Sequence, residues 1–263
     1  MSDALLESLQ DGVLTLTMNR PEKLNALSTA MGTRLLAAVQ SAALRAEVKV
    51  IVLTGAGKGF CAGGDVEAMA EGDGAEISFE QRMRGLRASM EISRLLHESP
   101  KPTIAMLRGA CAGAGMSLAL ACDLRISSDT LKFTTAFAKV GLSGDFGGTW
   151  YLTQLLGSAK AKELYLLSPV LRADEAERLG LVSRVVPDAE LESETRKLAL
   201  TLAQGASVAQ GYIKKNINAA EYQSLAEVMD LEAMHHTHCA TTADHREAAA
   251  AFVAKRTPVF KGA

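Results

Sequence analysis

Short apolar runs alternate with helical segments through the first half of the chain, and this order constrains the fold more than any other feature. Four runs have the length and the branched side chains of strands: 13–18, 48–54, 103–107 and 123–127. Apolar residues at helical spacing lie between them, in the helix that Ser28 is expected to cap and in a single helix expected over 79–97. Residues 114–121 are expected to form a buried helix of small residues and leucines. Strands separated by helices need crossover connections, which make neighbouring strands parallel. The order therefore predicts an α/β fold with a mainly parallel inner sheet.

Beyond Gly147 the sequence becomes almost entirely helical. Helices are predicted at 149–156, 159–167 and 173–179, and one more short strand at 181–186. We expect a core over residues 1–188 and a helical region over 189–263. The helical region either packs on the sheet or on a neighbouring subunit.

Composition narrows the class of protein and the kinds of partner. The chain has 263 residues, of which 48% are hydrophobic, so one large core is possible. A net charge of -2 argues against nucleic acid or an anionic membrane as a partner. The acidic start shows no signal peptide, and the low-charge stretch 109–122 is too short to span a bilayer. Four widely spaced cysteines favour a reduced, cytoplasmic protein.

Two glycine-rich segments, 55–66 and 109–123, each follow a strand and lead into a helix. Neither has the spacing of a phosphate-binding P-loop or a dinucleotide fingerprint, and the chain contains no GxSxG elbow. Their backbone N–H groups at a helix start are unpaired and electropositive. Two such groups aimed at one point make an oxyanion hole. The alternative is that these residues are small only because the packing is tight, and spacing alone leaves both interpretations open.

A cluster of histidines near the C-terminus raises the question of a metal site. The cluster comprises His235, His236, His238 and Cys239, on a predicted helix. No partner ligands at useful spacing are visible, so a solvated helix face is favoured over zinc. We expect no metal and no cofactor.

Six ordered segments resemble one family and together cover nearly the whole chain. They are NRPEKLNALS (19–28), GKGFCAGGDV (57–66), AGAGMSLALACD (112–123), KVGLSGDFGGTW (139–150), DEAERLGLVSRVV (174–186) and AFVAKRTPVFKG (251–262). The chain thus resembles the crotonase (enoyl-CoA hydratase/isomerase) superfamily. The resemblance implies a crotonase-like spiral of β-β-α turns followed by a C-terminal helical trimerisation region. It also implies an acyl-CoA substrate and a homotrimer or a hexamer built as a dimer of trimers.

The resemblance also assigns site residues. The two oxyanion N–H groups would belong to Gly64 and Ala114, the second of which is usually glycine in the family. Lys23 and Lys255 have an equally good alternative as solvated surface lysines. The residues implied in coenzyme A binding are Lys23, Leu24 and Ala26 on one wall, Ala62, Gly63, Gly64, Asp65 and Val66 on the other, and Phe252 and Lys255 in the tail.

The catalytic carboxylates of this chain depart from the pattern of the hydratases. Family hydratases use two glutamates, and their positions here hold Ser117 and Phe137. Neither side chain can act as a carboxylate acid or base, which puts ordinary hydration in doubt. Asp145 remains, where related isomerases and chlorobenzoyl-CoA dehalogenase have an aspartate. The surrounding sequence is most similar to the branch of ring-epoxide phenylacetyl-CoA isomerase and single-carboxylate enoyl-CoA isomerases.

These implications predict an isomerase of fatty acid or aromatic acid catabolism. Asp145 would take a proton from the acyl chain and return it two carbons away, while the two N–H groups stabilise the enolate. Burial would raise the Asp145 pKa and a following helix start would lower it. Asp145 as a mere helix N-cap, an enoyl-CoA hydratase, and a non-catalytic CoA-binding protein stay open as alternatives. The predicted acyl pocket consists of Phe137, Leu142, Phe146 and Trp150.

Overall fold

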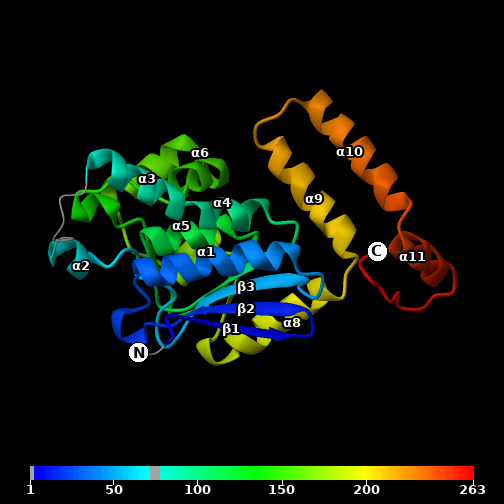
Figure 1. Ribbon diagram of the computed structural model, residues 1–263, viewed down its shortest axis with the longest axis horizontal. Helices are drawn as coiled ribbons and strands as arrows, with labels where there is room; N and C mark the ends of the chain where they lie inside the picture. Colours follow the sequence, from blue (N-terminus) through cyan, green and yellow to red (C-terminus); the bar gives the residue numbers. More distant parts are fainter. Residues whose placement is uncertain (1–2, 72–77) are drawn as a thin grey trace.

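The computed structural model describes residues 3–71 and 78–263, and a six-stranded sheet forms its centre (Figure 1). The first two strands are antiparallel and every later neighbour is parallel, so the predicted mainly parallel sheet is confirmed. In spatial order the strands are β1 (Leu5–Gln10), β2 (Val13–Met18), β3 (Val50–Gly55), β4 (Thr103–Leu107), β6 (Leu124–Ser128) and β9 (Arg184–Val186).

A second, three-stranded sheet consists of very short strands. In spatial order they are β5 (Ala110–Ala112), β7 (Lys132–Thr134) and β8 (Leu171–Arg172). A single bridge between Cys61 and Cys111 joins the loop after β3 to this sheet. The second sheet therefore brings the two glycine-rich segments side by side.

Helices cover both faces of the large sheet. On one face lie α1 (Thr29–Leu44), α4 (Glu91–Glu98) and α5 (Ala114–Ala121), and all eight residues of α5 are buried. On the other face α8 (Leu191–Ala203) contacts β3, β4 and β6 (Figure 1). The two faces have separate apolar clusters, and Leu191 and Ala199 of α8 belong to the smaller one. Two layers of helix around one sheet bury the apolar runs of the strands on both sides.

The helix boundaries agree with the sequence except at one point. Ser28 caps α1, since its hydroxyl accepts a bond from the Met31 N–H at 3.2 Å. The single helix expected over 79–97 is wrong, because the chain breaks at Met90 into α3 (Phe79–Ser89) and α4. α3 buries no side chain whereas α4 buries Ile92 and Leu96, so the two segments need different directions. The remaining early elements are η1 (Pro21–Lys23), α2 (Val66–Glu71), η2 (Phe137–Val140), α6 (Gly148–Leu167), α7 (Ala173–Arg178) and η3 (Asp188–Glu190).

Three C-terminal helices lie to one side of the sheet (Figure 1). They are α9 (Ser207–Ala220), α10 (Leu225–Ala240) and α11 (Ala243–Val253). α10 contacts α9 and buries His235, whose ring stacks on Tyr212 at 4.2 Å and whose Nδ1 lies 2.5 Å from Asn216 Oδ1. The solvated face expected for the histidine cluster is therefore wrong for His235. Within the described residues, no helix is both long and apolar enough to cross a membrane.

Candidate active site

The loop after β3 and the turn between β5 and α5 pack directly on each other. The Cys61 N–H donates to the Ala110 carbonyl at 3.0 Å, and the Ala112 N–H donates to the Cys61 carbonyl at 2.9 Å. A Cβ atom added to Gly63 would lie 3.1 Å from the Ala112 oxygen and 3.7 Å from the Ala114 nitrogen. Only a residue without a side chain permits this approach.

Gly64 and Ala114, the two predicted oxyanion residues, therefore lie in adjacent loops. Ala114 is the first residue of α5, whose early N–H groups have no partner inside the helix. Gly63, which precedes Gly64, is fixed by its carbonyl, which accepts from the Leu27 N–H at 2.7 Å. In the described parts of the chain neither the Gly64 nor the Ala114 N–H donates a hydrogen bond. Both amides are free for a ligand, and their convergence on one oxygen stays a prediction.

Tight packing explains a neighbouring glycine of the same segment. A Cβ atom on Gly115 would lie 2.6 Å from the Cβ of Cys61 and 2.4 Å from its carbonyl oxygen. Close packing therefore accounts for the small residue at position 115, and the oxyanion interpretation stays a prediction beside it.

Asp145 lies in the turn that leads into α6. Its Oδ1 atom is buried and has no hydrogen-bond partner in residues 3–71 and 78–263. Burial raises the pKa of this carboxyl to about 6. The helix begins at Gly148 with Gly147 as its N-cap residue. The alternative of Asp145 as the helix cap is therefore wrong.

A stacked pair of aromatic rings lies next to the turn that carries Asp145. The rings of Phe137 and Tyr165 stack with centroids 5.9 Å apart, and a Cβ atom on Gly113 would lie 3.8 Å from the Phe137 ring. Burial raises the pKa of the Cys61 thiol to about 12, and the charge of Asp145 contributes to that rise. Phe137 therefore lies beside the Gly113 turn, and its acyl-pocket role stays a prediction.

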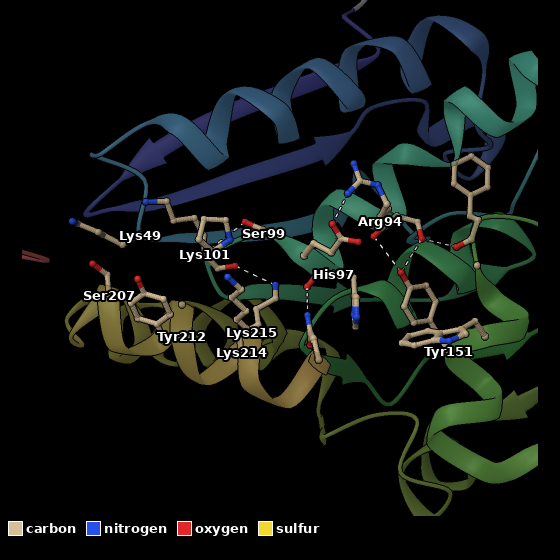
Figure 2. Close-up of a pocket in the computed structure, with 18 of the residues that line it drawn as sticks. Lys49, Arg94, His97, Ser99, Lys101, Tyr151, Ser207, Tyr212, Lys214 and Lys215 are labelled. Atoms are coloured by element: carbon tan, nitrogen blue, oxygen red, sulfur yellow. Dashed lines mark hydrogen bonds and ion pairs between the residues drawn. The ribbon is translucent and has the colours of Figure 1, made fainter. Parts of the chain in front are cut away.

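The other members of the predicted acyl pocket are Leu142, Phe146 and Trp150. Phe146 and Trp150 line a groove of about 1000 Å³ between α4 and α9 (Figure 2). Trp150 packs edge-on against the rings of His97 and Tyr151, each at 5.2 Å. Leu142 is half exposed. The contacts of Trp150 thus belong to the groove, and the acyl-pocket role of these residues stays a prediction.

Figure 2 also shows several lysines on the walls of that groove. Lys214 is buried and pairs with Asp123 at 2.9 Å, while its ammonium donates to the Leu96 carbonyl at 2.9 Å. Burial lowers the pKa of Lys214. This lysine fixes α9 to the body of the protein.

The two predicted walls of the coenzyme A channel are held together by one arginine. Arg20 donates to the Asp65 carboxylate and to the Ala26 carbonyl, both at 2.8 Å. The Ala62 N–H donates to the Leu24 carbonyl at 3.0 Å. The bond from Arg20 lowers the pKa of Asp65. Sequence reasoning missed Arg20, although it stands inside the segment NRPEK.

Two lysines of the predicted coenzyme A site have different surroundings. Lys23 is 38% exposed, contacts Glu67 and lies 3.8 Å from Asp65, so it is not simply solvated. Lys255 follows α11, and the nearby Phe252 is 85% exposed. In Figure 1, α11 and α2 lie at opposite ends of the molecule. One chain does not bring the tail residues to the wall that ends at Val66.

Comparison with known proteins agrees with this geometry. A family model described as "Enoyl-CoA hydratase/isomerase" matches residues 8–263. The chain is 38% identical to "1,2-epoxyphenylacetyl-CoA isomerase" of Escherichia coli (strain K12) over 262 residues, covering 100% of both chains. It is also 38% identical over 255 residues to "Probable enoyl-CoA hydratase" of Rhodobacter capsulatus, covering 97% of this chain and 96% of the relative. The crystal structure of an enoyl-CoA hydratase from Polaromonas sp. JS666 superposes with a TM-score of 0.92 at 32% identity, covering 97% and 99%.

Proposed function

Because the chain belongs to the enoyl-CoA hydratase/isomerase (crotonase) family of enzymes, we propose that it isomerises an acyl-CoA thioester with a single carboxylate base, Asp145. Relatives with equal identity carry the names of an isomerase and of a hydratase, so the choice rests on the residues of the site. The name of the Escherichia coli relative makes a ring-epoxide phenylacetyl-CoA one candidate substrate, and an enoyl-CoA is the other.

The carboxyl of Asp145 is the observation that supports isomerisation. It is half-buried, its enclosed Oδ1 atom has no partner among the described residues, and its pKa of about 6 suits a base at neutral pH. The positions of the two hydratase glutamates hold a buried serine, Ser117, whose hydroxyl lies 3.3 Å from the Gly113 carbonyl, and a buried phenylalanine, Phe137. A second carboxylate to activate water is therefore missing from those two positions.

The mechanism follows from the free amides and this base. The thioester oxygen accepts hydrogen bonds from the N–H groups of Gly64 and Ala114. As charge moves onto that oxygen, each donor stabilises the enolate by roughly 3–4 kcal/mol. Asp145 removes a proton from one carbon of the acyl chain and returns it two carbons away, so that the double bond shifts without gain or loss of atoms.

The coenzyme A moiety and the assembly complete the proposal. The pantetheine and adenine lie between the wall that contains Lys23, Leu24 and Ala26 and the wall from Ala62 to Val66. The protein assembles as a homotrimer or a dimer of trimers through its C-terminal helices. Large apolar side chains that are more than half exposed on α9 and α10 support this: Ile213, Ile217, Leu225, Met229 and Met234.

Product analysis tests the reaction. Purified protein is incubated separately with a 3-enoyl-CoA, a 2-enoyl-CoA and 1,2-epoxyphenylacetyl-CoA. The products are separated, and their masses are measured by mass spectrometry. Isomerisation yields products of unchanged mass, and Asp145→Asn loses them while still binding acetyl-CoA in calorimetry. Addition of one water to the 2-enoyl-CoA would identify a hydratase, and full turnover by Asp145→Asn would refute the base.

A further inference from the structure

A tyrosine hydroxyl lies beneath the turn that carries Asp145. Tyr165 stands on α6, and its buried hydroxyl makes no hydrogen bond of good geometry within the described parts of the chain, although an interaction with the Thr149 side chain lowers the Tyr165 pKa. A Cβ atom on Gly148 would lie 2.7 Å from this hydroxyl, and one on Gly144 would lie 3.5 Å from it. Gly144 and Gly148 flank Asp145, so the hydroxyl and the carboxyl share one small region.

Among residues 3–71 and 78–263, no cationic side chain balances the charge of the Asp145 carboxyl. Burial is the cause of its raised pKa, and the titratable side chains that face it are those of Cys61 and Tyr165. The Cys61 thiol has a pKa of about 12 and stays neutral. The charge of Asp145 contributes to the raised pKa of Tyr165. A neutral donor is therefore the available means of stabilising the ionised carboxyl.

Other donors near the turn are already engaged or reach water. The Gly148 N–H donates to the backbone carbonyl of Asp145 at 3.0 Å. The Ser117 hydroxyl lies 2.3 Å from the same Cβ position on Gly148 but is within 3.3 Å of the Gly113 carbonyl, to which it donates. Thr149 is exposed and can bond to water as well as interact with the Tyr165 hydroxyl, which leaves that hydroxyl able to turn to another acceptor. Of the described side chains near this turn, Tyr165 is the remaining buried donor.

We propose that Tyr165 is a positioning residue whose hydroxyl donates a hydrogen bond to the Asp145 carboxylate once an acyl-CoA closes the site. The inference rests on the proposed role of Asp145 as base and adds the group that orients it. The parallel stack on Phe137, at an interplanar angle of 6°, fixes the direction of the tyrosine ring. A phenylalanine would fill the same space, so packing alone does not account for the hydroxyl.

The bond has a measurable electrostatic consequence. A hydrogen bond to the ionised form lowers the pKa of a carboxyl, so its removal raises that pKa. In Tyr165→Phe the carboxyl of Asp145 should titrate at higher pH than in the wild type. The acid limb of the rate profile should move with it, and kcat should fall about tenfold or more while KM changes little. A purely structural role would not move the titration.

Carbon NMR of labelled aspartate and tyrosine, with acetyl-CoA bound, measures the titration directly. The Asp145 signal is assigned by its loss in Asp145→Asn. Tyr151→Phe is the matched control, because it removes a buried hydroxyl from the same helix that bonds instead to Ser93 at 3.1 Å. The control should keep the wild-type pKa of Asp145 and the wild-type rate.

The outcomes distinguish failure of the Tyr165–Asp145 hydrogen bond from failure of the proposed isomerase reaction. An unchanged Asp145 titration in Tyr165→Phe overturns the pairing, even if the rate falls. Should Tyr165→Phe not fold, the tyrosine signal of the wild type serves instead: it must follow the Asp145 titration, and that step must vanish in Asp145→Asn. A wild-type protein without isomerase activity overturns the proposed reaction, whereas the NMR titration still tests the bond.

Discussion

At the scale of single residues, burial of the Asp145 carboxyl raises its pKa. This shift determines the pH range of activity and lowers the stability of the folded protein. A carboxyl whose folded pKa is about 6 is ionised at neutral pH and protonated in mild acid. A base must be ionised to accept a proton, so kcat/KM for isomerisation should fall as the pH drops through about 6. Initial rates between pH 5 and 8 in constant ionic strength measure this limb. A plateau that continues unchanged down to pH 5 would contradict Asp145 as the base.

The same pKa makes a prediction about stability. The folded pKa of about 6 exceeds the ordinary aspartate pKa of 3.8, so between these pH values the folded protein binds more protons than the unfolded chain. Rising pH therefore disfavours the folded state, and above pH 6 the cost is fully present. Asp145→Asn should be more stable than the wild type at pH 7.5 by about 2 kcal/mol, and the difference should shrink toward pH 4. Urea denaturation at both pH values measures it; lower stability at pH 7.5 would indicate a structural carboxylate.

The sequence could identify Asp145 but not its partner. Asp145 stands in a segment whose neighbours resemble a known family, and residue type and position together indicated a base. Tyr165 stands at an ordinary core position of a helix, where a tyrosine is expected to contribute its ring. The turn from Gly144 to Gly148 folds over its hydroxyl. Local sequence patterns do not encode this contact, because the residues lie about a helix length apart in the chain.

At the scale of elements, the first turn of α5 depends on its contact with Cys61. Gly115→Ala would place a methyl group 2.6 Å from the Cβ of Cys61, so the helix or the loop must move apart. Separation of the two loops should lower kcat by about a hundredfold, as loss of an oxyanion donor does. It should also destabilise the fold by about 1–3 kcal/mol. Enzyme assays and urea denaturation measure the two effects.

A glycine in open space gives the matched control for that prediction. Gly32 lies inside α1, and a Cβ atom there meets nothing within 4 Å. Gly32→Ala should keep full activity and gain about 0.5–1 kcal/mol, because alanine favours the helix. Equal losses in both variants would show that the effect of Gly115→Ala does not come from the contact with Cys61.

The link between the channel walls depends on Arg20. Arg20→Met keeps the apolar stem but removes the bonds to Asp65 and to the Ala26 carbonyl. The walls should loosen, and KM for the acyl-CoA should rise by about fivefold while kcat stays near that of the wild type. Steady-state kinetics with varied acyl-CoA measure both constants. A fall in kcat at unchanged KM would place the role of Arg20 in the chemistry rather than in the channel.

Long elements were predictable and short ones were not. The strand 13–18, the strand 103–107 and the buried helix α5 carry strong apolar patterns, and the structure has them at the expected residues. The strands β5, β7 and β8 have two or three residues each, too few for any period to appear in the sequence. They exist because the chain passes close to itself there. These short strands join the segments of the candidate site, so the site was less visible in the sequence than the fold.

At the scale of the whole molecule, the C-terminal helices carry apolar side chains that the described chain leaves uncovered. Phe252 and Val253 on α11 are 85% and 83% exposed. Single exposed apolar residues are common, but neighbouring ones at this exposure indicate a contact surface. In the proposed assembly such a surface lets α11 of one subunit approach the coenzyme A channel of the next.

A subunit complementation experiment tests that arrangement. Asp145→Asn lacks the catalytic carboxylate but keeps the tail residues. A double variant, Phe252→Asp with Lys255→Glu, keeps the carboxylate but has altered tail residues. If each tail serves a neighbouring subunit, co-expression of the two inactive proteins restores sites that combine an intact base with an intact tail. Random mixing at equal amounts should restore roughly a quarter of the wild-type activity in a ring of identical contacts. Tails that serve their own subunit, or a monomeric protein in sedimentation, would give no recovery, because every site would then keep one damaged part.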